Sequence, residues 1–124
     1  MSFKYRRHHS YPESILIRDF MDKVNVNEII ASWEYLLGYN LLDDKIKGVI
    51  NNLSGCNVQM DMDSFKTLIE YLKTKDDLKK LKLAVICDQP QVIVFPLMGE
   101  LQEHSLQIKT FTTEEAAAEW IIYN

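Results

Sequence analysis

The sequence predicts a single α/β domain that contains a mixed, mostly parallel five-stranded sheet with four helices. Apolar segments with the length of strands alternate with segments in which apolar residues recur at helical spacing. One apolar segment, LAVIC at residues 83–87, is continuous, which is typical of a parallel strand with both faces buried. The predicted order is ββαβαβαβα, and the length of 124 residues suits one domain spanning residues 1–124.

The first two strands are expected to form an antiparallel hairpin. Apolar and polar side chains alternate over residues 3–8, as they do in a half-exposed strand. Residues 11–14 (YPES) contain a proline that favours a tight turn, and the apolar residues 15–17 follow as the second strand. His8 and His9 are neighbours on the predicted strand, so their side chains are expected on opposite faces and should not share a metal ion.

The first helix is predicted to begin after Asn25. Asn25 and Glu28 have the spacing of a capping box, in which side chains satisfy the free N–H groups of the first turn. An apolar stripe follows at helical spacing, formed by Ile29, Ile30, Trp33, Leu36 and Leu37. Gly38 is expected to be the left-handed residue just past the end of the helix.

The central part of the chain is predicted to be a strand, a polar turn and a helix. Residues 48–51 form the third strand, and the second helix starts near Asp61 or Asp63, either of which can cap it. Four residues at helical spacing bury one face of this helix: Phe65, Leu68, Ile69 and Leu72. In open α/β sheets, ligands and partners usually bind where such a strand ends and the next helix begins.

The last third of the chain completes the pattern. Pro90 is expected in the first turn of a third helix, which is kinked or starts late because Pro96 is unfavourable inside a helix. Residues 106–111 alternate apolar and polar side chains as the fifth strand. Thr112 and Glu115 form a second capping-box pair, which predicts the final helix.

Composition limits the classes of function. The net charge of −4 and the pI near 5.3 argue against nucleic acid as the main partner, because phosphate binding needs a basic face. No apolar run approaches the roughly 20 residues that span a bilayer. The first residues, MSFKYRRHH, lack the apolar region of a secretion signal. The two cysteines are therefore expected to be thiols in a reducing compartment, and the protein to be cytoplasmic.

Four motifs follow one another along nearly the whole chain: GVINNLSG (48–55), MDSFKTLIEYLK (62–73), LKLAVICDQP (81–90) and IKTFTTEEAAAEWI (108–121). Together with the predicted order of strands and helices, they resemble a STAS domain, the sulfate-transporter and anti-sigma-factor-antagonist module. The similarity is closer to its SpoIIAA-like branch of small stand-alone bacterial proteins. The strand followed by the F-T-T-E-E-A-A phrase is the most specific of the four motifs.

This sequence departs from the antagonist pattern at the position of the phosphoswitch. Asn52 stands where the antagonists have an aspartate before L-S-G. After the M-D-S phrase at 62–64, Phe65 and Lys66 replace a second serine and a glycine. The resemblance therefore implies a non-enzymatic regulatory or protein-interaction module without a clear phosphoswitch. The branch is also similar in fold to CRAL-TRIO lipid-transfer domains, so the alternative function is a carrier of lipid or another apolar ligand.

Six residues near the ends of the predicted strands are candidates for binding a protein partner or a phosphate: Ser54, Gly55, Asp61, Asp63, Ser64 and Asp88. The free N–H groups of a helix start favour a phosphate at Ser64. The alternative is that the aspartates cap the helix or end a strand, and that Ser64 is an ordinary first-turn serine. The three carboxylates would also suit Mg²⁺. Since capping explains their positions, no metal or cofactor is expected.

The segment at 92–98 is apolar nearly all round. It predicts a homodimer contact or the lining of an apolar pocket, with the candidates Val92, Phe95, Met98 and Leu101. Cys56 and Cys87 are expected to be core residues rather than nucleophiles, because no local pattern places His104 beside either of them. No catalytic set can be assembled from local patterns, so an enzyme is not expected. The expected partner is an unidentified protein or an apolar small ligand.

Overall fold

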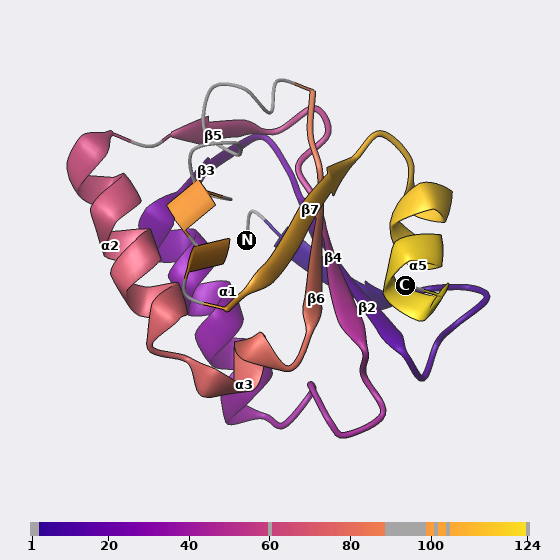
Figure 1. The fold of residues 1–124 in the computed structure, drawn as a ribbon. Helices are drawn as coiled ribbons and strands as arrows, with labels where there is room; N and C mark the ends of the chain where they lie inside the picture. The colour runs from indigo at the N-terminus through magenta and orange to yellow at the C-terminus, as the bar shows by residue number, and fades with distance from the viewer. Residues whose placement is uncertain (1–2, 60, 89–98, 101, 104, 124) are drawn as a thin grey trace.

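A five-stranded sheet forms the centre of the computed structural model, which describes residues 3–59, 61–88, 99–100, 102–103 and 105–123 (Figure 1). The strand order is β1-β2-β4-β6-β7. β1 (Phe3–Arg7) runs antiparallel to β2 (Ile15–Phe20), whereas β4 (Gly48–Asn52), β6 (Lys82–Ile86) and β7 (Gln107–Phe111) continue the sheet in parallel. The prediction of an α/β domain with a mixed five-stranded sheet is confirmed.

The helices cover both faces of the sheet (Figure 1). α1 (Val26–Gly38), α2 (Met62–Lys73) and the short α3 (Asp76–Lys79) lie on one face, and α5 (Glu114–Tyr123) lies on the other. These four helices belong to the described residues; the helix that we predicted from Pro90 falls largely outside them. α3 was not predicted as a separate element.

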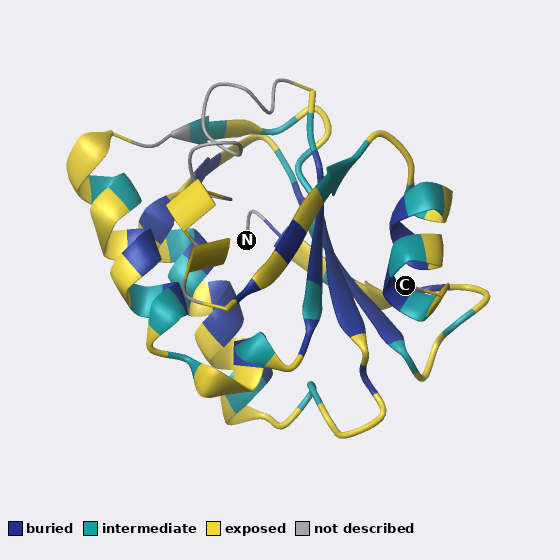
Figure 2. Ribbon diagram, in the orientation of Figure 1, coloured by how far each residue is buried: buried dark blue, intermediate teal, exposed yellow. Residues whose placement is uncertain are grey.

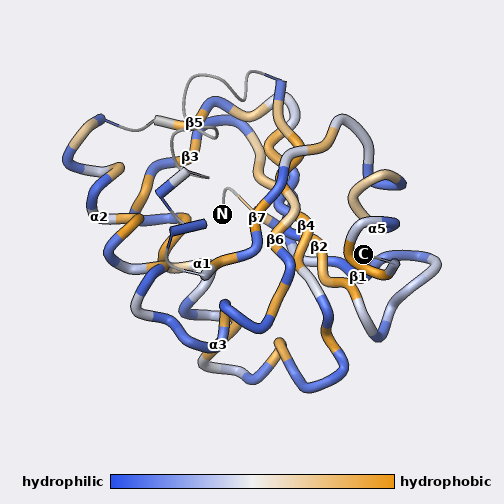
Figure 3. Tube along the Cα trace, viewed as in Figure 1, coloured by the Kyte–Doolittle hydropathy of each residue, from blue (hydrophilic) through white to orange (hydrophobic). Residues whose placement is uncertain are grey.

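Two hydrophobic cores result, because successive side chains of each strand point to opposite faces of the sheet. On the face of α1 and α2, the buried residues include Leu16, Trp33, Leu36, Val49, Leu68, Leu72, Leu83 and Val85. On the face of α5, they are Ile15, Ile17, Ile50, Ala84, Ile86, Ala117, Ala118 and Ile121. The central strands are buried along most of their length and strongly hydrophobic (Figures 2 and 3).

Two of the three predicted N-terminal caps are confirmed. The Asn25 side chain accepts the Glu28 N–H at 2.9 Å, and the Asp61 carboxylate accepts the Ser64 N–H at 2.8 Å. The third is wrong, because the side chain that caps α5 is Thr113, whose Oγ1 accepts the Ala116 N–H at 3.1 Å, and not Thr112. The prediction for Gly38 is wrong, because Gly38 is the last residue of α1 and the left-handed residue is Asn40, with φ of 54°. Asparagine tolerates this conformation better than most side chains, which is why a glycine is not required there.

The structure also contains a second, two-stranded parallel sheet that the sequence did not reveal. It pairs β3 (Lys23–Asn25) with β5 (Asn57–Gln59). Each strand has only three residues, which is too short for a period-2 pattern to be recognised. β5 lies between the end of β4 and the start of α2, so it separates two segments that we had treated as one surface.

The expectation for His8 and His9 is also wrong. β1 ends at Arg7, so the strand alternation does not extend to these two residues. Their rings stack with centroids 4.5 Å apart instead of pointing to opposite faces. His8 is buried and His9 is exposed.

Candidate functional site

The parallel strands β2, β4, β6 and β7 all end at one side of the sheet, which we call the carboxyl edge. In the register of the sheet, Asp19 of β2 lies beside Asn52 of β4, and Asn52 lies beside Ile86 of β6. The chain leaves β4 through residues 53–56 (LSGC), which we call the 53–56 loop. This edge is the usual binding position in open parallel sheets.

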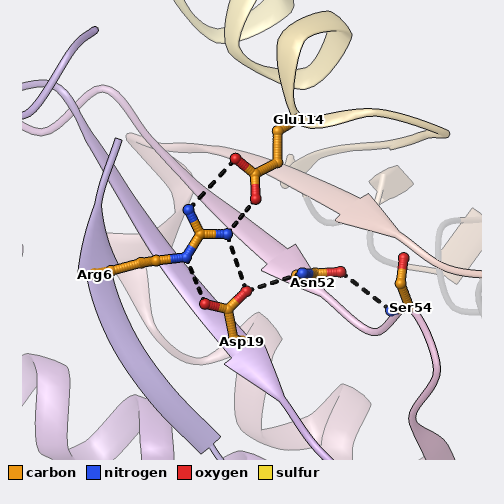
Figure 4. Close-up of polar contacts among 5 residues, drawn as sticks. All are labelled: Arg6, Asp19, Asn52, Ser54 and Glu114. Carbon is orange, nitrogen blue, oxygen red and sulfur yellow. Dashed lines mark hydrogen bonds and ion pairs between the residues drawn. The ribbon is translucent and has the colours of Figure 1, made fainter. Parts of the chain in front are cut away.

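Arg6 of β1 links three elements at this edge (Figure 4). Its Nε and Nη2 donate to the Asp19 carboxylate at 2.5 and 3.1 Å, and its Nη1 and Nη2 both donate to Glu114 at the start of α5. Burial alone would raise the pKa of Asp19, but the hydrogen bonds from Arg6 and Asn52 outweigh burial and lower this pKa. We call Arg6, Asp19 and Glu114 the arginine brace.

Asn52 connects the arginine brace to the loop. Its Nδ2 donates to Asp19 Oδ1 at 2.9 Å, and its Oδ1 accepts the Ser54 N–H at 3.1 Å (Figure 4). An amide can do both because it carries a donor and an acceptor, whereas an ionised carboxylate only accepts. An aspartate at this position would place a second negative charge against Asp19. The asparagine at this position therefore has a local chemical reason.

Asp88 holds the other side of the 53–56 loop. Its Oδ2 accepts the Gly55 N–H at 2.9 Å, and the Leu53 N–H donates to the Ile86 carbonyl at 2.7 Å. Gly55 has φ of 71°, a conformation that favours glycine. The structure thus brings together three of the predicted residues, Ser54, Gly55 and Asp88, around an exposed turn.

The other three predicted residues lie elsewhere. Asp61, Asp63 and Ser64 belong to the start of α2, which lies beyond β5 and well away from the carboxyl ends of β4 and β6 (Figure 1). The Ser64 N–H is already bound to Asp61, and this hydrogen bond lowers the pKa of the Asp61 carboxyl. A phosphate at Ser64 would stand beside a carboxylate that already occupies the helix start. Among the described residues, no three Asp, Glu, His or Cys side chains are grouped closely enough to hold a metal ion.

A buried polar cluster around Arg18 was not predicted. Arg18 lies in β2 on the face of α1 and is only 3% exposed. Its Nε and Nη2 donate to Asn51 Oδ1 at 2.8 and 2.5 Å, and its Nη1 donates to Ser32 Oγ at 3.0 Å. The guanidinium carbon lies 3.7 Å from the centroid of the Trp33 ring. Tyr5 donates its hydroxyl hydrogen to this cluster, at the Ser32 carbonyl or hydroxyl.

No carboxylate side chain neutralises Arg18. All 18 Asp and Glu side chains of the chain are among the described residues, and none of them forms a hydrogen bond or ion pair with Arg18. Burial lowers the pKa of Arg18 to about 9, so the guanidinium is still charged at pH 7. The cation is held by neutral acceptors and by the face of an aromatic ring. A charged residue at an inward position of an apolar strand (ILIRDF) was the sequence signal for this cluster.

His8 is a second buried polar residue, and its Nε2 has no hydrogen-bond partner within the described part of the chain. The Ser10 N–H donates to His8 Nδ1 at 3.1 Å, so the hydrogen of the neutral ring lies on Nε2. Burial lowers the pKa of His8, the neighbouring His9 adds to this effect, and Glu114 opposes it. Protonation would place a charge in a buried site and remove the acceptor of the Ser10 N–H.

We therefore expect His8 to make the protein less stable in mild acid. Because the folded pKa lies below the unfolded value of 6.5, the unfolded chain binds more protons, and stability falls as the pH drops below 6.5. Urea unfolding between pH 7.5 and 5 measures this loss. His8→Phe should keep the stacking and remove most of the loss, whereas His9→Phe, at the exposed neighbour, should retain it. An unchanged loss in His8→Phe would contradict this assignment.

Cys56 is not an activated nucleophile in the part of the chain that the structure describes. Burial raises the pKa of the Cys56 thiol, and Asp22 and Glu28 raise it further, so the thiolate is disfavoured. Cys87 is partly buried at the end of β6. His104 lies outside the described residues, as do Val92, Phe95, Met98 and Leu101.

In the described segments, no helix has both the length and the apolar character needed to cross a membrane. No family model, curated protein or solved structure matches this chain.

Proposed function

We propose that the protein is a non-enzymatic interaction module that presents the 53–56 loop to a protein partner. The observation that carries this proposal is the way the loop is held: the Ser54 N–H is bound to Asn52 and the Gly55 N–H to Asp88. Ser54 and Gly55 are both exposed. A loop that is already in one conformation loses less conformational freedom when a partner binds.

The arginine brace also supports the proposal, because it is linked through Asn52 to the start of the loop. Arg6 joins β1, β2 and α5 through the carboxylates of Asp19 and Glu114. Asn52 donates to Asp19 and accepts the Ser54 N–H, so it links the arginine brace to the loop. The ion pairs are partly exposed, so each one contributes little to global stability, on the order of 0–1 kcal/mol. Their role in the proposal is local, because they fix the position of the strand end from which the loop departs.

The resemblance to STAS domains remains a hypothesis within this proposal. Its support is the N-terminal hairpin and the parallel pairing of β4 with β6. In the chain, α2 comes after β4 and before β6. A module without a phosphoswitch agrees with the Ser64 N–H being bound to Asp61. A cytoplasmic location is part of the same proposal.

Site-specific photocrosslinking in cells that produce the protein tests the proposal. A photoreactive residue at Ser54 should yield one discrete protein adduct, and the same residue at the exposed Lys47, at the other end of β4, should not. Asp88→Ala releases the Gly55 N–H and should lower the adduct yield several-fold. An adduct with a second copy of the chain would show that the partner is the same protein, in a homodimer. Equal adducts from both positions, or none from Ser54, would contradict the proposal.

Native mass spectrometry of the purified protein addresses the alternative function. The interaction module predicts the mass of the chain alone. A retained lipid or other apolar molecule would favour the carrier instead, with Val92, Phe95, Met98 and Leu101 as its first candidates for substitution.

A further inference from the structure

A groove opens at the opposite end of the molecule from the carboxyl edge. Its lining residues come from the end of α1, from the connection at residues 39–47 and from residues 77–81 in and just after α3. These segments lie near the starts of β4 and β6 (Figure 1). Its volume is about 300 Å³. We infer that this groove binds a small organic cation with an aliphatic body, such as a primary alkylammonium ion. The inference does not depend on the proposed function, because the two sites share no residue.

Aliphatic side chains form the base of the groove, while polar atoms make up the larger part of its accessible surface. Leu36 is fully buried, Ile46 and Leu81 are 5% exposed, and Leu37 and Leu42 are half-buried beside them. All five side chains belong to the core on the face of α1 or pack against it. An aliphatic chain would remove water from Leu37 and Leu42, which favours binding by about 25 cal/mol for each Å² of apolar surface that is covered.

The rim of the groove is acidic. Asp43, Asp44 and Asp77 line it and are exposed, and Lys80 is the one cation among the lining residues. All 14 Lys and Arg side chains are among the described residues, and none of them forms an ion pair with these three aspartates. The lining therefore carries an excess of negative charge around a small aliphatic base. A ligand that matches both features has a cationic head and an apolar body.

The groove suits an organic cation better than a bare metal ion. Among the described residues, no three Asp, Glu, His or Cys side chains are close enough together to hold a metal, and the leucines of the base offer no oxygen ligand. A water molecule has about 30 Å³ of liquid volume, so the groove has room for roughly ten non-hydrogen atoms. The groove therefore has room for the whole of a short alkylammonium ion such as hexylammonium.

Titrations followed by ¹⁵N–¹H NMR test the inference with three probes of the same aliphatic body. Hexylammonium should shift the amides around Leu37, Leu42 and Asp77, with a Kd about tenfold lower than that of neutral 1-hexanol. Hexanoate should bind more weakly than either, because its charge has the wrong sign. Salt at 0.5 M should reduce the preference for hexylammonium, since the rim is exposed. Equal affinities for the three probes, or no shifts in the groove, would overturn the inference.

Two variants at neighbouring positions separate the effect of a carboxylate on the rim from the effect of a change in the net charge of the protein. Asp77→Asn should weaken hexylammonium binding several-fold and leave 1-hexanol unchanged. The matched control is Asp76→Asn, because Asp76 precedes Asp77 in α3, does not line the groove and pairs with Lys79. Leu42→Trp, which fills the groove, should abolish the shifts from all three probes. If Asp76→Asn and Asp77→Asn weaken binding equally, the rim does not recognise the cation.

Discussion

Replacing Asn51 by alanine is expected to lower the free energy of unfolding by about 3 kcal/mol, because it leaves the buried Arg18 charge without its main acceptor. Asn51 Oδ1 accepts two of the three hydrogen bonds that Arg18 donates to described side chains. The variant also loses the hydrogen bond from Asn51 Nδ2 to the Ala84 carbonyl, at 2.9 Å. Urea unfolding at pH 7 measures the loss. Asn52→Ala, at the partly exposed next position, is the matched control and should cost about 1 kcal/mol or less.

The same substitution in an Arg18→Met background shows whether the charge is the cause. Arg18→Met removes the buried cation and keeps an apolar side chain of similar length against Trp33, so it should change stability much less than Asn51→Ala does. In that background, Asn51→Ala should cost only about 1 kcal/mol, for the bond to Ala84. If Asn51→Ala costs the same with and without Arg18, the uncompensated charge does not dominate the energetics of this cluster.

Replacing Gly48 by alanine is expected to destabilise the protein by about 2–3 kcal/mol through overpacking. A Cβ at Gly48 would lie 2.7 Å from the Lys82 carbonyl oxygen and 2.7 Å from Ile121 Cγ2. The Ile121 side chain can turn away, but the carbonyl belongs to the backbone of β6, which is hydrogen-bonded to β4. The glycine therefore allows α5 to pack closely over the start of β4.

Gly38→Ala is the control for this substitution. Gly38 ends α1, and a Cβ there would meet nothing within 4 Å. We expect Gly38→Ala to leave stability unchanged or to raise it by about 0.5–1 kcal/mol, because alanine restricts the unfolded chain and favours a helix. Thermal and urea unfolding of the two variants give the comparison. A similar loss in both would mean that the close approach of α5 and β6 at Gly48 is not the cause.

The position of α5 matters at the other end of the sheet as well. Ile121 packs against Gly48, while Glu114 in the first turn of α5 binds Arg6 in the arginine brace. A displacement of α5 would therefore also change the contact that supports the 53–56 loop. Under the proposed function, Gly48→Ala should lower crosslinking from Ser54 even under conditions in which the protein remains folded.

Much of the architecture could be predicted from local patterns. The LAVIC segment was expected to be a parallel strand inside the sheet, and β6 does lie between β4 and β7 in parallel. The capping pair Asn25 and Glu28 marked the start of α1, because the hydrogen bond that it makes is local. β3 and β5 could not be predicted, since three residues carry no recognisable period and each strand depends on the other.

The candidate site was predictable only in part. Ser54, Gly55 and Asp88 were selected because they follow parallel strands, and such strands end at one edge. Asp61 and Ser64 were grouped with them because they are close in sequence, but β5 takes the chain away before α2 begins. The arginine brace joins residues up to 108 positions apart, and no local pattern marks such a connection.

By itself, the sequence determined the class of the domain, the parallel character of its central strands and the places where α1 and α2 begin. These features depend on apolar periodicity and on hydrogen bonds between residues a few positions apart, which are properties of short segments. Only the tertiary structure decided that Arg18 lies buried without a carboxylate, that Arg6 joins three elements, and that three aspartates line a groove with aliphatic side chains at its base. Each of these depends on side chains that folding alone brings together from distant segments, so their charges and hydrogen bonds meet only in the assembled sheet.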